Sequence, residues 1–174
     1  MKGVSRPGWM ALILAALVIV VDQATKYWIL AVLKLEEGQS IEIAGPLRLT
    51  GVWNRGVSFG LLRADHDLVR WVFVAFSLAV AIVLAGWVRK TERPLFATAL
   101  GFLMGGAIGN AIDRVRFGAV TDFVDVSQLH FPWVFNVADA AINVGIACLL
   151  LDMLLQDRQE KATRAAERAV GGPS

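Results

Sequence analysis

The sequence is short of the residues on which several common kinds of site depend. It has one cysteine, Cys148, so no disulfide forms within the chain. Its two histidines, His66 and His130, lie far apart and lack the ligand spacing of a zinc site. The formal net charge is +2, and the basic residues form neither a stripe nor a nucleic-acid motif. We therefore expect no nucleic acid as a partner, no metal and no other cofactor.

Charge is scarce as well. Charged residues are 18% and hydrophobic residues 56% of the 174 residues, and the mean hydropathy of +0.58 is too high for a soluble domain of this length. Four apolar stretches are long enough to cross a bilayer, and all five prolines lie outside them. We predict an all-α membrane protein, one integral-membrane domain over residues 1–174, with spans at about 9–33, 71–88, 95–112 and 134–155 and a flexible tail at 157–174.

The first stretch follows Lys2 and Arg6, as a cleaved secretory signal does. However, no small-x-small cleavage site follows it, and apolar sequence resumes after Lys26, so we interpret it as a membrane helix. Nine Lys and Arg lie in the terminal tails and the short 89–94 loop, against seven in the two longer loops. Per residue this bias is clearer, and it predicts cytoplasmic termini.

The polar segment 34–67 predicts a small extracytoplasmic β-sheet between the first and second helices. Its runs 41–43 and 47–50 have strand character and are divided by Gly45-Pro46. Asn54-Arg55-Gly56 has the composition of a turn. We expect this sheet to lie on the bilayer surface.

Polar residues inside the spans indicate where function lies. Asn136, Asp139 and Asn143 are spaced i, i+3, i+7 and share one helix face. A carboxylate within a membrane costs roughly 2.5–3.5 kcal/mol, so a paired or functional one is expected. Asp22 and Lys26 stand four residues apart and are placed to pair. Hydrogen bonds between helices explain Asn110, Asn136 and Asn143 as well as a functional role does.

With the termini inside, most of these polar residues share the outer level of the bilayer, while Asp152 alone lies at the inner end, where we expect it to be solvated. No serine–histidine or cysteine–histidine pair is apparent, which leaves carboxylate chemistry. Two close carboxyl groups share a proton, so that one serves as acid and the other as base. The residues alone leave the choice of pair open among four carboxylates: Asp22, Asp113, Asp122 and Asp139.

Two other classes compete with a hydrolase. A small transporter or channel needs polar residues at several depths, whereas here they crowd one side of the membrane. A non-catalytic assembly or lipid-binding protein needs no carboxylate pair and tolerates Asp-to-Asn changes.

Five motifs occur in order along the chain: Asp22-Gln23-Ala24-Thr25-Lys26, Asn54-Arg55-Gly56-Val57-Ser58-Phe59, the glycine-rich run from Gly105 to Arg114, Gly118-Ala119-Val120-Thr121-Asp122-Phe123, and Phe135-Asn136-Val137-Ala138-Asp139. In this order and spacing the chain resembles the bacterial lipoprotein signal peptidases (signal peptidase II) over residues 9 to 155. The resemblance implies an intramembrane aspartyl endopeptidase of the bacterial cytoplasmic (inner) membrane, active near the outer leaflet. It implies removal of signal peptides from diacylglyceryl-modified prolipoproteins by a cut just before the lipidated cysteine.

The resemblance also implies roles for particular residues. Asp122 and Asp139 match the family's catalytic aspartates. Eight further residues match positions that shape the site or contact substrate: Asp22, Lys26, Asn54, Gly56, Asn110, Asp113, Arg114 and Asn136. The chain departs at Val57-Ser58, where the family often has two alanines, a change that bears on loop packing or lipid fit and leaves the pair untouched. Expected partners are prolipoproteins and membrane lipids, and the expected state is a monomer.

Overall fold

A computed structural model describes residues 3–56, 66–129 and 133–170; the departure at Val57-Ser58 lies outside these residues. The elements are, in order, α1 (Arg6–Tyr27) with a π-helical continuation (Trp28–Val32), β1 (Ser40–Ala44), β2 (Leu47–Asn54), α2 (His66–Val88), α3 (Pro94–Phe117), β3 (Val120–Asp125), a 3₁₀ turn (Ser127–Leu129), β4 (Val134–Phe135) and α4 (Val137–Val170).

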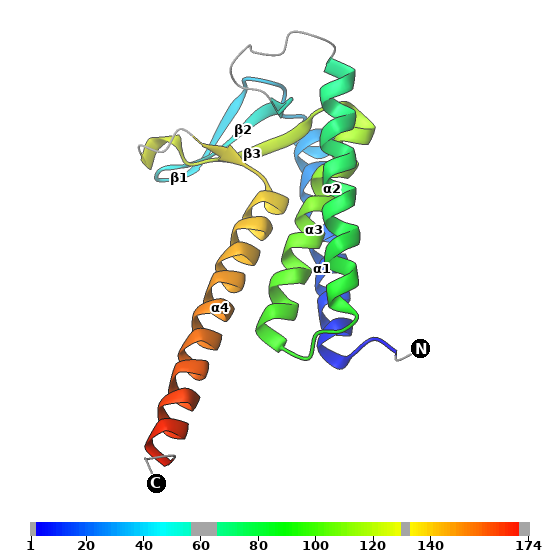
Figure 1. Ribbon diagram of the computed structural model, residues 1–174. Helices are drawn as coiled ribbons and strands as arrows, with labels where there is room; N and C mark the ends of the chain where they lie inside the picture. Colours follow the sequence, from blue (N-terminus) through cyan, green and yellow to red (C-terminus); the bar gives the residue numbers. More distant parts are fainter. Residues whose placement is uncertain (1–2, 57–65, 130–132, 171–174) are drawn as a thin grey trace.

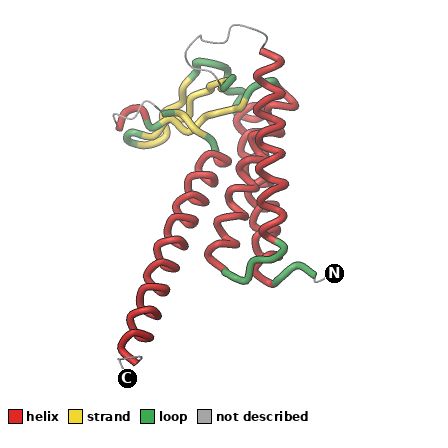
Figure 2. The backbone as a smooth tube through the Cα atoms, viewed as in Figure 1, coloured by secondary structure: helices red, strands yellow, loops and turns green. Residues whose placement is uncertain are grey.

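The predicted architecture of four membrane helices and a small sheet is confirmed. All four α-helices are long and apolar enough to cross a membrane. Figure 1 shows α1, α2 and α3 side by side, while α4 diverges from them. The sheet lies at one end of the bundle and the two chain termini at the other (Figures 1 and 2). Both termini lie at the same end of the bundle, as expected for a chain that crosses the membrane an even number of times.

Several helix boundaries differ from those expected. Helix α2 begins at His66 and α3 continues to Phe117, where Gly118 ends it with a left-handed φ of 78° and an N–H bond to the Arg114 carbonyl. The segment expected to be a flexible tail continues α4 as far as Val170. Charge pairs four residues apart, such as Lys161 with Asp157 at 2.7 Å, support that extension.

The sheet has four antiparallel strands in the order β1-β2-β3-β4. The strands β1 and β2 correspond to the predicted runs, whereas β3 and β4 come from the segment between α3 and α4 and were not predicted. Residues 134–135, expected to begin the fourth span, form β4 instead. Pairing of Val52 with Asp122 and of Asn54 with Val120 brings the segment after α1 and the segment after α3 together. The sheet therefore delivers residues from distant parts of the chain to one place.

Helix α3 is central because its glycines permit close approach on two sides. A Cβ atom at Gly105 would lie 2.6 Å from Cβ of Val18 in α1, and one at Gly106 would lie 2.6 Å from Cγ1 of Ile142 in α4. Real side chains do not fit at such distances, so both helices pack directly on the α3 backbone. Gly105 and Gly106 thereby let α1 and α4 each pack closely against α3.

The end of the bundle opposite the sheet corrects one expectation. Asp152, expected to be solvated, is buried and forms an ion pair with Arg93. Arg93 immediately precedes α3, and α3 packs along α4, so its guanidinium reaches the carboxylate. Beside it, the Ser5 hydroxyl donates to the carbonyl of Thr91, and Ser5 also caps α1. The 89–94 loop therefore contacts α4 through Arg93 and the start of α1 through Thr91.

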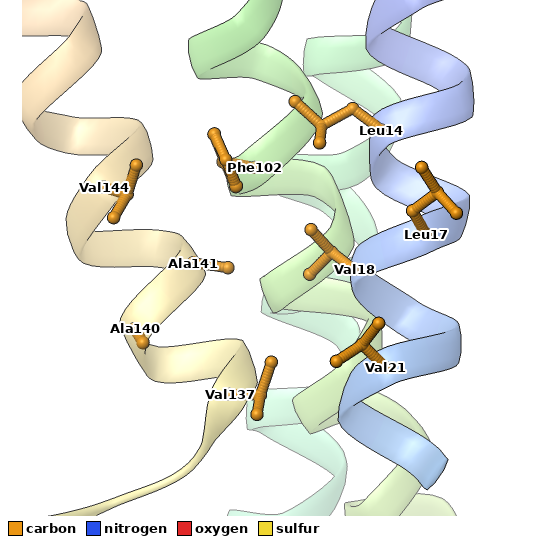
Figure 3. A pocket seen from close by; sticks show the side chains of 9 residues that line it. All are labelled: Leu14, Leu17, Val18, Val21, Phe102, Val137, Ala140, Ala141 and Val144. Carbon is orange, nitrogen blue, oxygen red and sulfur yellow. The ribbon is translucent and has the colours of Figure 1, made fainter. Parts of the chain in front are cut away.

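A groove of about 360 Å³ opens between α1 and α4, with α3 behind it. Figure 3 shows that every side chain lining it is apolar. On α4 the lining includes Val137, Ala140 and Val144, which share one helix face, whereas Asp139 and Asn143 belong to another. The groove thus offers neither a hydrolytic group nor the polar path that transport requires.

Candidate active site

Helix α4 begins with a reciprocal cap that contains one of the two predicted aspartates. Asn136 precedes the helix, and its Oδ1 accepts the N–H of Asp139 at 2.9 Å. In return Oδ2 of Asp139 accepts the N–H of Asn136 at 3.3 Å. This is a capping box with Asn and Asp in place of Ser or Thr and Glu. The local sequence therefore fixes the Asp139 carboxylate at the end of α4 that adjoins the sheet.

Asp122 comes from the sheet and is nearly completely buried. Its Oδ1 accepts Nδ2 of Asn136 at 2.6 Å, and its Oδ2 accepts Nδ2 of Asn54 at 3.0 Å. The Asn54 amide is oriented by the following turn, in which the N–H of Gly56 donates to Asn54 Oδ1 at 2.9 Å. Gly56 has a φ of 87°, a conformation that favours glycine. Both oxygens of Asp122 thus accept side-chain amides.

Asn110, from α3, links the two aspartates to a buried cation. Its Nδ2 donates to Oδ1 of Asp139 at 2.8 Å. Its Oδ1 accepts Nδ2 of Asn136 at 3.2 Å and Nζ of Lys26 at 3.3 Å. An ammonium only donates, so Lys26 requires the amide oxygen to face it and the NH₂ group to face Asp139. These contacts fix the orientation of the side-chain amide of Asn110, a residue that the sequence placed in the site.

Lys26 is the centre of a buried charge cluster, defined here as Lys26, Asp22 and Asp113. Its Nζ lies 2.8 Å from Asp22 Oδ2 and 2.9 Å from Asp113 Oδ2. Asp22 also accepts the N–H of Ala138 in the first turn of α4, at 2.9 Å, and Asp113 accepts the N–H of Thr121 in β3, at 3.0 Å. The cluster therefore holds the two elements that carry Asp139 and Asp122.

Two aspartates three residues apart on β3 have opposite environments. Burial, and secondarily the charge of Asp139, raises the pKa of Asp122 from 3.8 to about 6. Hydrogen bonds from Ser127 and Thr50, with the charge of Arg48, lower the pKa of Asp125 to about 2. Of these two aspartates, Asp122 therefore keeps its proton to the higher pH.

Arg114 lies close by without pairing with either aspartate. Its guanidinium is 4.9 Å from the ring centre of Phe73, and its Nη1 donates to the Asn110 carbonyl at 3.3 Å. Within residues 3–56, 66–129 and 133–170, no Lys or Arg nitrogen lies within 4 Å of a carboxylate oxygen of Asp122 or Asp139. Amides bridge this pair, and in the described part of the chain no cation contacts it directly. Such a pair favours retention of one proton.

Comparison with known proteins identifies the family. Residues 14–155 match the family model described as Signal peptidase (SPase) II. The chain belongs to the signal peptidase II family. It is 52% identical over 158 residues to the lipoprotein signal peptidase of Caulobacter vibrioides, covering 90% of this chain and 94% of that one. It is 45% identical over 168 residues to that of Methylorubrum extorquens, covering 96% and 94%. A solved bacterial membrane enzyme is similar with a TM-score of 0.75 and 28% identity, covering 92% of this chain and 96% of its own.

In this signal peptidase II, the fold gathers the predicted polar residues around the Asn110–Asn136 pair, with Gly56 acting through Asn54 and Arg114 at the margin. Two contributors were missed. Gln23 donates to Asp113 at 2.9 Å and to Asp22 at 3.2 Å, and its place beside Asp22 inside an apolar span was an available signal. Phe73, under the Arg114 guanidinium, carries no signal in an apolar helix.

Proposed function

We propose that Asp122 and Asp139 are the catalytic pair with which this signal peptidase II removes signal peptides from prolipoproteins. One observation carries the proposal: Asn136 donates from its side chain to Asp122 and from its main chain to Asp139. A single residue therefore brings together a carboxylate from the sheet and one from a membrane helix. The activity itself is the one named in the similar proteins of Caulobacter and Methylorubrum.

The chemistry follows from a pair that shares one proton. The ionised carboxylate takes a proton from water, and that water attacks the scissile carbonyl carbon. The protonated carboxyl group donates to the carbonyl oxygen. As the C–N bond breaks, the departing amine receives the proton that the first carboxylate took from water, and a hydroxyl proton of the intermediate returns to the second carboxylate. The pair titrates as a unit, and the pKa of Asp122, raised to about 6, keeps a proton on the pair to a higher pH than an isolated aspartate would. In this scheme the amides of Asn54, Asn110 and Asn136 orient the carboxylates, and the charge cluster of Lys26 positions the elements that carry them.

The proposed substrate is a precursor with a diacylglyceryl-modified cysteine, cut just before that cysteine by a monomeric enzyme surrounded by membrane lipids. The proposed location is the bacterial inner membrane, with both termini cytoplasmic and the pair near the outer leaflet. Support comes from the Lys and Arg bias and from the position of the termini opposite the sheet (Figure 1). A signal peptide with its basic end inside presents its cleavage site at the same level.

The test is cleavage of a lipidated precursor by the purified, reconstituted protein. Because Asn keeps the shape of Asp but cannot exchange a proton, Asp122→Asn and Asp139→Asn should each lower kcat by about 10²–10⁴-fold. Asp125→Asn, on the same strand as Asp122, is the matched control and should stay within about tenfold of the wild type. Activity within tenfold of the wild type for either member of the pair would contradict the assignment. Chelators should have no effect, and loss of activity on metal removal would favour a carboxylate-bound metal.

A further inference from the structure

Asn143 is a polar residue of α4 that the proposed chemistry leaves unused. It lies four residues beyond Asp139, so it shares that helix face and is about 6 Å deeper along the helix axis. Its side chain is exposed, as are its apolar neighbours Val144 and Ile146. The other strongly polar residue between 140 and 155, Asp152, is buried. Among the described residues, nothing forms a hydrogen bond with the Asn143 amide.

An exposed amide at this depth is unfavourable without a partner. The hydrocarbon supplies no hydrogen bonds, and each unsatisfied polar group there costs several kcal/mol. Leucine or valine, which occupy similar exposed positions along α4, would avoid that cost. Nor does the amide serve the apolar groove, because the groove residues of α4 occupy a different face (Figure 3). Asn143 thus has no partner among the described residues, and a peptide bound at the face that also carries Asp139 is placed to supply one.

We propose that the Asn143 amide binds the main chain of the signal peptide about two residues before the scissile bond. This inference rests on the proposed function. To be cut, the substrate helix must unwind at the site, which leaves main-chain N–H and C=O groups without partners inside the bilayer. An asparagine amide offers both donors and an acceptor, so it matches a peptide group.

The depth of Asn143 determines which peptide group it meets. Extended chain advances about 3.3 Å per residue, so a 6 Å separation from Asp139 corresponds to roughly two residues. Helix α4 runs from the sheet towards the termini-bearing end of the bundle, which places Asn143 deeper than the pair (Figure 1). The part of the substrate that lies deeper is the signal peptide itself, upstream of the bond. The contact is to main chain, so it does not depend on a particular substrate side chain.

The experiment measures kcat/KM for a lipidated precursor with reconstituted wild type and three variants. Asn143→Leu should lower kcat/KM by roughly three- to twentyfold, the effect expected for one hydrogen bond within a membrane. Val144→Leu, an apolar change at the next exposed position, should leave it unchanged. The swap Asn143→Val with Val144→Asn keeps the amide but turns it about 100° around the helix, and should not restore activity. All variants should unfold at the wild-type temperature.

A second arm identifies the contacted group. Precursors in which the second or third peptide bond before the scissile bond is replaced by an ester lack one N–H donor. Wild type should cleave one of them more slowly, and Asn143→Leu should show no further loss with that substrate.

Three results would overturn the inference. The first is a kcat/KM of Asn143→Leu within twofold of the wild type, and the second is a loss of kcat/KM from the ester that multiplies independently with the loss from Asn143→Leu. The third is a loss of kcat/KM in Asn143→Leu that accompanies dissociation of an oligomer, which would assign Asn143 to a contact between copies of the chain. Failure of the proposed function is distinct, since it appears as retained cleavage by Asp122→Asn.

Discussion

Removing the charge of Lys26 should destabilise the protein more than removing the whole charge cluster. Lys26 is buried with both of its carboxylate partners, at 2.8 Å from Asp22 and 2.9 Å from Asp113. Lys26→Met leaves two buried carboxylates without a cation. A carboxylate that loses its partner inside a protein or membrane is costly, whereas a neutral, hydrogen-bonded replacement is tolerated.

The expected magnitude follows from the loss of one partner of a buried ion pair, which costs about 3–5 kcal/mol. For a chain of this length, 1 kcal/mol shifts the unfolding temperature by about 2–4 °C, so Lys26→Met should unfold roughly 6–20 °C lower. Because Lys26 has two partners, the double variant Lys26→Met with Asp22→Asn still leaves Asp113 unpaired. Only the triple variant with Asp113→Asn should recover most of the loss, since asparagine oxygens can still accept the N–H groups of Ala138 and Thr121.

The assay is thermal unfolding of the purified variants in one detergent, followed by tryptophan fluorescence, with Lys161→Met as control. Lys161 pairs with Asp157 at an exposed position, so its removal should change the unfolding temperature by no more than about 2 °C. Equal unfolding temperatures for Lys26→Met and the triple variant would refute the reasoning. They would mean that the carboxylates are not coupled through Lys26.

Three further outcomes are expected. The pKa of Asp122 is raised in the folded state, so its contribution to stability should be lost as the pH rises from about 4 through about 6, and Asp122→Asn should remove this dependence in chemical unfolding curves. Gly109→Ala places a Cβ 2.7 Å from a buried carboxylate oxygen and should cost about 1–3 kcal/mol, whereas Gly86→Ala meets nothing within 4 Å and should be neutral in thermal unfolding. In a cysteine-free background, cysteine at Gln128 should react with an impermeant thiol reagent in spheroplasts, and cysteine at Thr163 only after permeabilisation; the reverse would contradict the orientation.

The sequence by itself determined the parts of the protein that depend on the bilayer and on neighbours within one helix. Hydropathy and the positions of proline sufficed for the four spans, because a membrane admits few alternatives to a helix. The pairing of Asp22 with Lys26 followed from a spacing of four residues. The placement of Asp139 with Asn136 at one level of the fourth helix likewise followed from local spacing.

Tertiary structure decided what depends on contacts between distant segments. Lys26 could not be assigned to Asp113, nor Arg93 to Asp152, because partners 87 and 59 residues away are chosen by helix packing. The strand β3 was hidden for the same reason: its pairing with β2, and hence the meeting of Asp122 with Asn54, is not encoded in local periodicity. From the residues alone, four aspartates were equivalent candidates. The fold pairs Asp22 and Asp113 with Lys26, whereas among the described residues Asp122 and Asp139 are joined through amides. A buried cation can closely accompany only the carboxylates that pack against it.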